Sequence, residues 1–303
     1  MKLLYQYFKK RYHNKGKYFR KRFSKKLEYY LFLNTKPQVQ SKNLLSFNRD
    51  NSKVDVVTIA FNNAVIIEHQ INLLRENLTD KFTHIIADNS IDLSVRSSIF
   101  ETCNRLGALY VSIPAHNYLK NDSHAVAMHW VYKNVIRKRN NKYFGFLDHD
   151  IFPVKLCSII AKLKNNIYGR IITPDYHPIC ETVTNEQPYW SLWAGFCFMK
   201  ADLLYHKNVY KVSFFTKDTE NGQLDTGGGL WDTVYKKIPF PGELAKYSNV
   251  KFRNSDVSNI HTDYYECLDG EWIHMVNLSN SYPTPDFQGK IEYLENLLDA
   301  SIH

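Results

Sequence analysis

Short apolar runs alternate with segments of helical periodicity along the first half of the chain. The runs have strand length and are rich in β-branched or aromatic residues, as strands buried on both faces are: 54–61, 83–87, 109–113 and 143–147. Helices are predicted between them, because apolar residues there recur every three or four positions. This order predicts an α/β fold with a parallel sheet and helices on both sides.

Polar and glycine residues mark where two of these helices begin or end. Gly107 is placed to end the helix expected at 94–106, because glycine adopts the left-handed conformation without strain. The run at 121–123, Asn-Asp-Ser, offers candidate N-caps for a helix that continues to Arg139. The strand at 143–147 is expected to follow that helix.

The second half of the chain has a different pattern. A short helix is predicted at 156–163 and a strand at 169–173. The aromatic segment from Tyr189 to Lys200 has the composition of a further strand, and a glycine run precedes a helix expected to end at Lys237. The sequence therefore divides into a nucleotide-binding-like first half and an aromatic, glycine-containing second half.

Two carboxylates, Asp148 and Asp150, follow the strand at 143–147. Open α/β sheets bind ligands at the carboxyl ends of their strands. Mg²⁺ and Mn²⁺ favour oxygen ligands and usually share them with substrate phosphate. The pair predicts a divalent-cation site, whereas a solvated acidic turn is the alternative that the tripeptide alone leaves open. His149, between them, is expected to point the other way and to be structural.

Composition limits the class of protein. The 303 residues are 44% hydrophobic, which predicts a folded chain of one large or two modest domains. No apolar run approaches the about 18 residues that span a bilayer, and no secretory signal is recognised at the amino terminus. Five dispersed cysteines without a C-x-x-C pair indicate buried thiols in a reducing compartment, which favours the cytoplasm: Cys103, Cys157, Cys180, Cys197 and Cys267.

The net charge of +9 is concentrated at the amino terminus. Residues 1–26 contain eight Lys and three Arg, no acidic residue and seven aromatic residues. Such a segment fits an anionic membrane surface, where each basic residue contributes about 1 kcal/mol. It also fits nucleic acid phosphates, or a basic leader without a partner. The sequence leaves these three alternatives open.

The order of the motifs resembles the GT-A class of nucleotide-sugar glycosyltransferases, and within it the large bacterial group called family two. Five segments carry the resemblance: Thr58–Asn63, Ile85–Ser90, Phe146–Asp150, Trp193–Phe196 and Leu224–Gly228. It implies a three-layer α/β/α fold with a mostly parallel central sheet. It also implies a hexosyltransferase that moves a sugar from a UDP-sugar to a glycan or lipid-linked acceptor, with inversion, in bacterial surface polysaccharide synthesis.

The resemblance implies a metal site for Mn²⁺ or Mg²⁺. Asp150 would ligate the ion directly, and Asp148 would contact the ribose or a metal-bound water. His274 resembles the late histidine that completes the metal shell in some GT-A enzymes. A histidine in an apolar strand is also a common core residue, so both alternatives stay open for His274.

The remaining implied roles concern the donor and the base. The nucleoside would be framed by Phe61, Asn62 and Asp88, and the sugar by Trp193, Gly195 and Gly227. Asp225 is the preferred base and Asp232 the reserve. Structural alternatives are a strand-ending turn for Asp88, a core position for Trp193, an N-cap for Asp225 and a solvated helix position for Asp232. The Gly227–Gly229 run is also what a plain loop requires.

The sequence departs from the family in two places. A lone Asp225 replaces the usual Glu-Asp pair of the catalytic loop, and the basic leader has no general counterpart. The expected organisation is a leader at 1–34, a linker at 35–53, a catalytic domain at 54–288 and a C-terminal helix at 289–303. A cytoplasmic enzyme, peripheral on the inner membrane face, is expected.

Two other functions remain as alternatives. A sugar-phosphate nucleotidyltransferase should carry a Gly-rich basic phosphate loop after its first strand, and residues 61–64, Phe-Asn-Asn-Ala, offer none. A nucleic-acid-binding protein would act through the basic leader. Nucleic acid is the less favoured partner, because the basic charge is confined to one end of the chain and the Asp148/Asp150 pair would face the ligand.

Overall fold

The computed structural model describes residues 25–45, 52–174, 188–252, 263–278 and 285–299. The chain forms two compact units, Met1–Lys36 and Pro37–His303. In the first unit, residues 25–34 are helical. The basic segment 1–24 lies outside the described residues, and so does Cys180.

Part of the expected linker belongs to the second unit. Gln40 forms an antiparallel bridge with Val111, and the Ser41 amide donates to the Tyr110 carbonyl at 2.8 Å. The expectation of a plain linker at 35–53 is therefore wrong for this stretch. Its residues extend the edge of the main sheet because their backbone groups find partners there.

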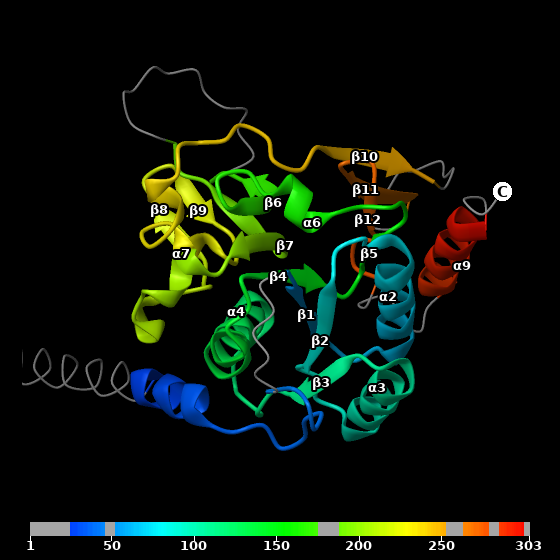
Figure 1. Cartoon of the computed structure of the whole chain (residues 1–303), viewed down its shortest axis with the longest axis horizontal. Coiled ribbons are helices and arrows are strands. Elements are labelled where there is room, and N and C mark those ends of the chain that lie inside the picture. The colour runs from blue at the N-terminus through cyan, green and yellow to red at the C-terminus, as the bar shows by residue number, and fades with distance from the viewer. Residues whose placement is uncertain (1–24, 46–51, 175–187, 253–262, 279–284, 300–303) are drawn as a thin grey trace, which may run out of the picture. The chain divides into compact units, whose positions relative to one another are not determined.

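The second unit is built on a central sheet with the strand order β3-β2-β1-β4-β7-β6 (Figure 1). The strands are β1 (Val54–Ala60), β2 (Phe82–Asp88), β3 (Leu109–Ser112), β4 (Tyr143–Asp148), β6 (Ile167–Ile172) and β7 (Ser191–Lys200). The first four are mutually parallel, and β7 runs antiparallel to β4 and to β6. The predicted α/β class with a mostly parallel sheet is confirmed.

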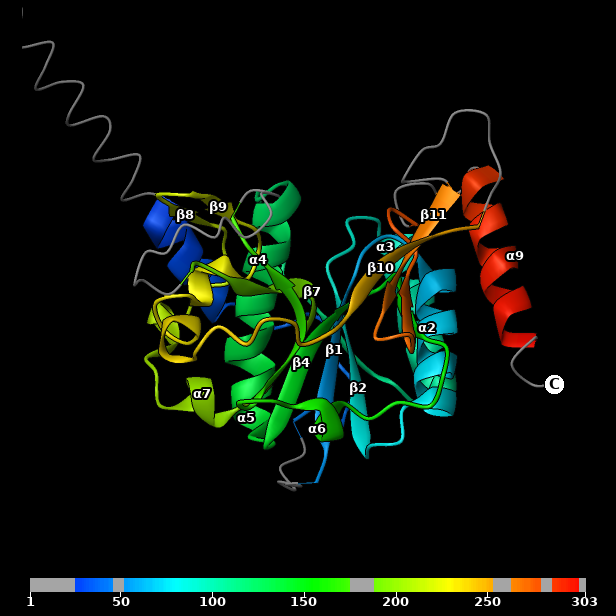
Figure 2. The same ribbon diagram turned by 90° about the horizontal axis from the view of Figure 1, so that it is seen from above.

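Helices cover both faces of this sheet, as predicted (Figure 2). One face carries α2 (Ala64–Asn77) and α3 (Leu93–Leu106), and the other carries α4 (Lys120–Val131), which continues through a π-turn (Tyr132–Ile136) into α5 (Arg137–Arg139). Gly107 ends α3 with φ of 65°, as expected. The predicted caps at 121–123 are wrong: α4 already begins at Lys120, so these residues lie in its first turn, and Leu119 is its N-cap.

A second sheet, absent from the prediction, has the strand order β10-β11-β12-β5. Its strands are β5 (Ile151–Pro153), β10 (Tyr247–Lys251), β11 (Tyr264–Leu268) and β12 (Trp272–His274). The chain leaves the central sheet at the end of β4 and enters the second sheet at β5. The two residues between these strands are His149 and Asp150, so the predicted metal motif lies where the two sheets meet.

The other elements are short, apart from α9. They are α6 (Ile159–Lys162), α7 (Asp202–Tyr205), β8 (Lys217–Thr219), β9 (Gly222–Leu224), and 3₁₀ turns at Val209–Lys211, Gly228–Leu230 and Tyr235–Lys237. Two 3₁₀ turns thus replace the helix expected to end at Lys237. The C-terminal helix α9 spans Pro285–Asp299 and so includes residues before the predicted 289–303 segment, of which 300–303 lie outside the described residues. Its apolar residues pack with α2, β5 and β12.

Two further findings bear on the sequence predictions. Four cysteines are free thiols in the described part of the chain: Cys103, Cys157, Cys197 and Cys267. The helices among the described residues are all too short or too polar to cross a bilayer.

Candidate functional site

The turn between β4 and β5 opens into a cavity of about 400 Å³, here called the aspartate cavity. Asp148, His149 and Asp150 all line it. The side chain of Asp148 is 24% exposed and that of Asp150 is 9% exposed. His149 was expected to point away from the carboxylates, but it also lines this cavity. Its Nδ1 lies 3.2 Å from the Ile59 carbonyl oxygen. The strand end therefore presents two carboxylates to one cavity.

The second sheet brings His274 to Asp150. His274 Nε2 lies 3.5 Å from Asp150 Oδ1, and His274 Nδ1 lies 2.7 Å from Glu266 Oε2. The Met275 amide also donates to the Asp150 carbonyl at 2.9 Å. These contacts fix Asp150 and the imidazole relative to each other. Of the two alternatives left open for His274, the structure favours a place in the site.

The charges of this group are interdependent. Burial lowers the pKa of His274, but the carboxylates of Asp150 and Glu266 outweigh it and raise that pKa to about 10. Burial raises the pKa of Asp150, but the charge and hydrogen bond of His274 hold it at about 2. Burial and the neighbouring Asp150 charge raise the pKa of Asp148, with His124 acting in the opposite direction. His274 is thus held as an imidazolium between Asp150 and Glu266, and a metal ion bound at its Nε2 would have to displace the proton there.

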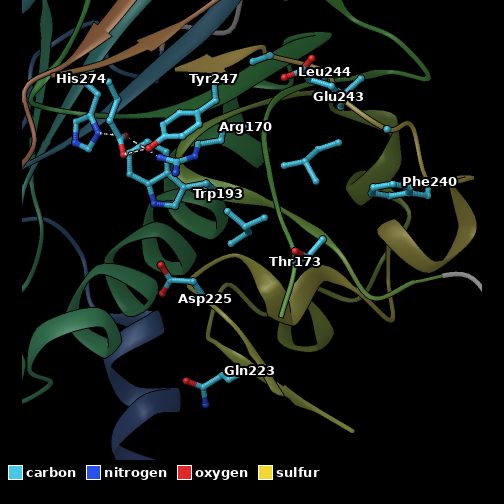
Figure 3. Close-up of a pocket in the computed structure, with 15 residues that line it drawn as sticks. Arg170, Thr173, Trp193, Gln223, Asp225, Phe240, Glu243, Leu244, Tyr247 and His274 are labelled. Carbon is cyan, nitrogen blue, oxygen red and sulfur yellow. Dashed lines mark hydrogen bonds and ion pairs between the residues drawn. The ribbon is translucent and has the colours of Figure 1, made fainter. Parts of the chain in front are cut away.

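Glu266 connects this group to a second cavity of about 750 Å³, here called the aromatic cavity. Its Oε2 also accepts from Arg170 Nη1 at 2.7 Å, and its Oε1 accepts from the Tyr247 hydroxyl at 3.0 Å. The Arg170 guanidinium lies 4.0 Å from the ring centre of Tyr247 and 5.3 Å from that of Trp193. Figure 3 shows this group at one end of the aromatic cavity.

The two cavities adjoin. Trp193 and His274 line both of them. Asp225 lines the aromatic cavity, and its Oδ1 accepts from Asn121 Nδ2 at 3.3 Å and from the Thr226 amide at 2.7 Å. Asn121 in turn lines the aspartate cavity. The exposed Asp225 carboxylate thus stands at the passage between the cavities, on the side opposite Arg170 (Figure 3).

Gly195 is required where β7 passes Asp148. A Cβ at this position would collide with Asp148 Oδ2, and it would lie 2.6 Å from Cζ2 of Trp193. The absence of a side chain therefore lets the carboxylate and the indole lie over the strand. The predicted role of Gly195 beside a sugar stays a prediction, and what the structure shows is that a side chain has no room here.

We expect Gly195→Ala to weaken binding of nucleotide with Mn²⁺ at least tenfold, or by about 1.4 kcal/mol, because the methyl group displaces Asp148 or Trp193. Calorimetric titration with UDP and Mn²⁺ measures this. Gly270→Ala is the control: it strains a residue with φ of +69° but adds a methyl group to open space. Equal loss of affinity in both variants would contradict a local effect.

Of the three residues predicted to frame the nucleoside, one lines the aspartate cavity as described and two do not. Phe61 lines the aspartate cavity. Asp88 does not: it is fully buried, and its carboxylate accepts from the Tyr110 hydroxyl and the Ser90 amide, both at 2.8 Å. Asn62 has φ of 51°; its backbone amide donates to Ser90 Oγ at 2.8 Å, and its side-chain Oδ1 accepts from the Ile91 amide at 3.2 Å. The predictions for Asp88 and Asn62 are corrected, since both side chains organise the loop that presents Asn89.

Two further predictions are corrected. Gly227 has φ of 96°, and a Cβ there would lie 2.9 Å from the Leu192 carbonyl oxygen, so its close backbone approach is to β7. Asp232 lines neither cavity as the described residues define them. Its side chain is 63% exposed and pairs with Lys217 Nζ at 2.7 Å. This leaves Asp225 as the candidate base.

Sequence reasoning missed several residues of the site: Asn89, Asn121, Ser123, His124, Arg170 and Glu266. His124 Nε2 lies 3.6 Å from Asp148 Oδ1. The polar run at 121–124 was the available signal, but it was interpreted as helix capping. Arg170 and Glu266 had no signal in the sequence: Arg170 lies in a predicted strand without assigned chemistry, and Glu266 lies in β11, which is not predicted.

The side chains fit a divalent cation only if a substrate supplies further ligands. No group of three or more His, Cys, Asp or Glu residues that could hold a metal is found in the described ranges. Asp150 and His274 offer one oxygen and one nitrogen, and Glu266 orients the imidazole from its far side, as carboxylates do at metal-bound histidines. Mg²⁺ that serves nucleotides commonly has one or two protein carboxylates and phosphate oxygens. The donor set fits that type of site.

Comparisons with known proteins find no match in sequence and partial matches in structure. No model of a protein family and no curated protein matches the sequence. Solved structures do match: the galactosyltransferase LgtC with donor and acceptor sugar analogues, at 14% identity and a TM-score of 0.36, covers 52% of this chain and 61% of its own.

Two further structures contain Mn²⁺. Glucosyl-3-phosphoglycerate synthase from Mycobacterium tuberculosis, with Mn²⁺, UDP and glucosyl-3-phosphoglycerate, shares 15% identity over 50% of this chain and 58% of its own, with a TM-score of 0.32. Mannosyltransferase PcManGT from Pyrobaculum calidifontis, with GDP-Man and Mn²⁺, shares 14% identity over 59% of this chain and 51% of its own, with a TM-score of 0.32. The chain thus covers less than two thirds of each. Their class agrees with the predicted resemblance, but overlaps this partial carry no functional argument.

Proposed function

We propose that this protein is a glycosyltransferase that moves a sugar from a nucleoside diphosphate sugar to an acceptor hydroxyl. One observation carries the proposal: a strand-end carboxylate pair faces a cavity that adjoins a larger aromatic cavity lined by the exposed carboxylate of Asp225. Sugar transfer needs a cation site for the diphosphate, a place for the nucleoside and a base for the acceptor. Candidates for each of these line the two adjoining cavities.

The aspartate cavity is the proposed donor site. Asp150 and His274 would hold Mn²⁺ or Mg²⁺, which would neutralise the developing charge on the leaving diphosphate. Asp148 would take a ribose hydroxyl, since its carboxylate is the more exposed of the pair. Phe61 and Asn89 would frame the nucleoside. We propose a UDP-sugar as the donor, following the habit of the family that the sequence resembles.

The aromatic cavity is the proposed acceptor site. Trp193, Phe240 and Tyr247 offer apolar ring faces, and Gln223 and Glu243 offer polar groups, all lining one space (Figure 3). Aromatic rings beside polar groups suit a glycan, whose sugar rings combine apolar faces and hydroxyls. Asp225, at the passage toward the donor, would accept the proton of the attacking hydroxyl, which corresponds to an inverting reaction.

A cellular setting follows from the same proposal. The acceptor would be a glycan or lipid-linked sugar of a bacterial surface polysaccharide, used at the cytoplasmic face of the inner membrane. The basic aromatic segment 1–26 would hold the enzyme on anionic lipid. Release of the protein from anionic vesicles after deletion of that segment is the result that supports this setting.

Titration of the purified protein with UDP, GDP and deoxythymidine diphosphate, each with and without Mn²⁺, tests the proposal. We expect one nucleotide to bind, and its affinity to rise when Mn²⁺ is present. No binding of any nucleotide under either condition would contradict the proposal. Binding to DNA or RNA that depends on salt and not on Mn²⁺ would favour the nucleic-acid alternative.

We expect Glu266→Gln to weaken Mn²⁺ binding in the presence of nucleotide by about 10- to 100-fold, because the charge that orients His274 is lost. The electron paramagnetic resonance signal of free Mn²⁺ measures this affinity. Glu271→Gln is the matched control, since Glu271 pairs with Lys162 at 2.6 Å and lines neither cavity as described. Unchanged Mn²⁺ affinity in Glu266→Gln would show that Glu266 does not support the metal site.

A further inference from the structure

One side chain of α2 forms hydrogen bonds to the backbone of the turn that carries the aspartate pair. Gln70 is fully buried, and its Nε2 donates to the Asp148 carbonyl at 2.7 Å and to the Ile151 carbonyl at 2.8 Å. These two carbonyls bracket the turn on either side of His149 and Asp150. α2 packs directly against β5, which brings Gln70 to this position (Figure 1). A single amide group thus fastens both ends of the turn.

The orientation of this amide is fixed by its other contact. The Thr58 hydroxyl donates to Gln70 Oε1 at 2.7 Å, so the Nε2 side must face the two carbonyls. The Thr58 oxygen lies 3.0 Å from His84 Nε2 and accepts from it, because the only hydroxyl hydrogen is already used. Thr58 is fully buried and His84 nearly so. The column His84, Thr58 and Gln70 therefore crosses an otherwise apolar layer and ends at the turn.

Buried polar groups lower the stability of a fold unless each has a hydrogen-bond partner, and an apolar residue could fill the same space without that requirement. What the column adds is a defined position for the backbone of the turn. We propose that Gln70 is a positioning residue for the donor site. It holds the turn so that Asp150 faces the cation and Asp148 faces the ribose of the same bound nucleotide. This inference rests on the proposed function.

The chain contains a matched control on the same helix. Asn77 lies two turns after Gln70 and also donates an amide hydrogen to the β4–β5 segment, from Nδ2 to the Pro153 carbonyl at 3.1 Å. This second bond fastens the far end of β5 and touches neither aspartate. Loss of either amide leaves buried carbonyl groups without a donor, so both variants should unfold at lower temperature. Only loss of Gln70 should disturb the site.

The test compares Gln70→Met with Asn77→Leu. The quantity measured is the dissociation constant of UDP without Mn²⁺ divided by that with Mn²⁺, or the same ratio for GDP or deoxythymidine diphosphate if wild type binds one of these. We expect the ratio to fall about tenfold or more in Gln70→Met and to stay at the wild-type value in Asn77→Leu. Methionine keeps the length of glutamine without its donors, so packing is disturbed little. The ratio reports metal-assisted binding and not general stability.

Thr58→Val provides a second variant if Gln70→Met does not fold. It removes the hydroxyl that orients Gln70 and keeps the buried volume, and we expect a smaller fall in the same ratio. Wild-type binding that Mn²⁺ does not strengthen would overturn the proposed function itself. Normal ratios in both Gln70→Met and Thr58→Val, beside a metal-dependent wild type, would overturn only the positioning role. An equal fall in Asn77→Leu would also overturn it.

Discussion

Asp150→Ala is expected to abolish the dependence of nucleotide binding on Mn²⁺. The affinity for UDP with Mn²⁺ should fall at least about a hundredfold, or about 2.7 kcal/mol, while the weak metal-independent affinity stays as it is. The reason is geometric: Asp150 is the carboxylate that faces His274 Nε2 at 3.5 Å, and it is 9% exposed. Its loss removes the carboxylate oxygen that would ligate the metal ion together with His274. Calorimetry with and without Mn²⁺ measures the change.

Asp202→Ala is the control for this variant, because Asp202 is 53% exposed and pairs with Lys200 on the surface. It should bind nucleotide and Mn²⁺ as wild type does. Asp150→Ala removes the carboxylate that pairs with buried His274, so we expect its melting temperature to fall, and binding is compared at a temperature where the variant is folded. A variant that folds normally and still shows full Mn²⁺-dependent affinity would exclude Asp150 as a metal ligand.

The strands and main helices from β1 to β4 could be predicted in order because six of the seven are specified locally. The strands from β1 to β4 are continuous apolar runs of strand length, and α2 and α3 have clear helical periodicity. The aspartate pair was found for the same reason: it follows directly after such a run. The second sheet was missed, since β5 and β12 have three residues each and depend on partners far away in the sequence.

The errors within the site have the same physical origin. Asp88 follows a strand, as a ligand-binding residue should, but Tyr110 on the neighbouring strand captures its carboxylate. Glu266 is an unremarkable strand residue until the fold places His274 and Arg170 on either side of it. Gln70 has the sequence context of any helix residue, and its role depends on the packing of β5 against α2, which brings the Ile151 carbonyl to its amide. Contacts between distant segments decide such roles, and one sequence does not display them.

Asp225→Asn is expected to separate chemistry from binding. Sugar transfer should slow by about 10²- to 10⁴-fold, the contribution typical of a general base, while nucleotide affinity with Mn²⁺ stays within about twofold of wild type. The substitution keeps the shape of the side chain and an oxygen for Asn121 and the Thr226 amide. What it removes is the ability to take a proton at the passage between the two cavities. Release of UDP from a UDP-sugar, with lipid-linked and glycan acceptors, measures the rate.

Asp232→Asn is the matched control, because it makes the same change in a carboxylate that pairs with Lys217 and is 63% exposed. Its rate should equal that of wild type. Loss of transfer in Asp232→Asn, with Asp225→Asn active, would reverse the assignment of the base. A fall in nucleotide affinity in Asp225→Asn would place its carboxylate on the donor. Full activity in both variants would require a base elsewhere, and Glu243, which also lines the aromatic cavity, would be the next carboxylate to replace.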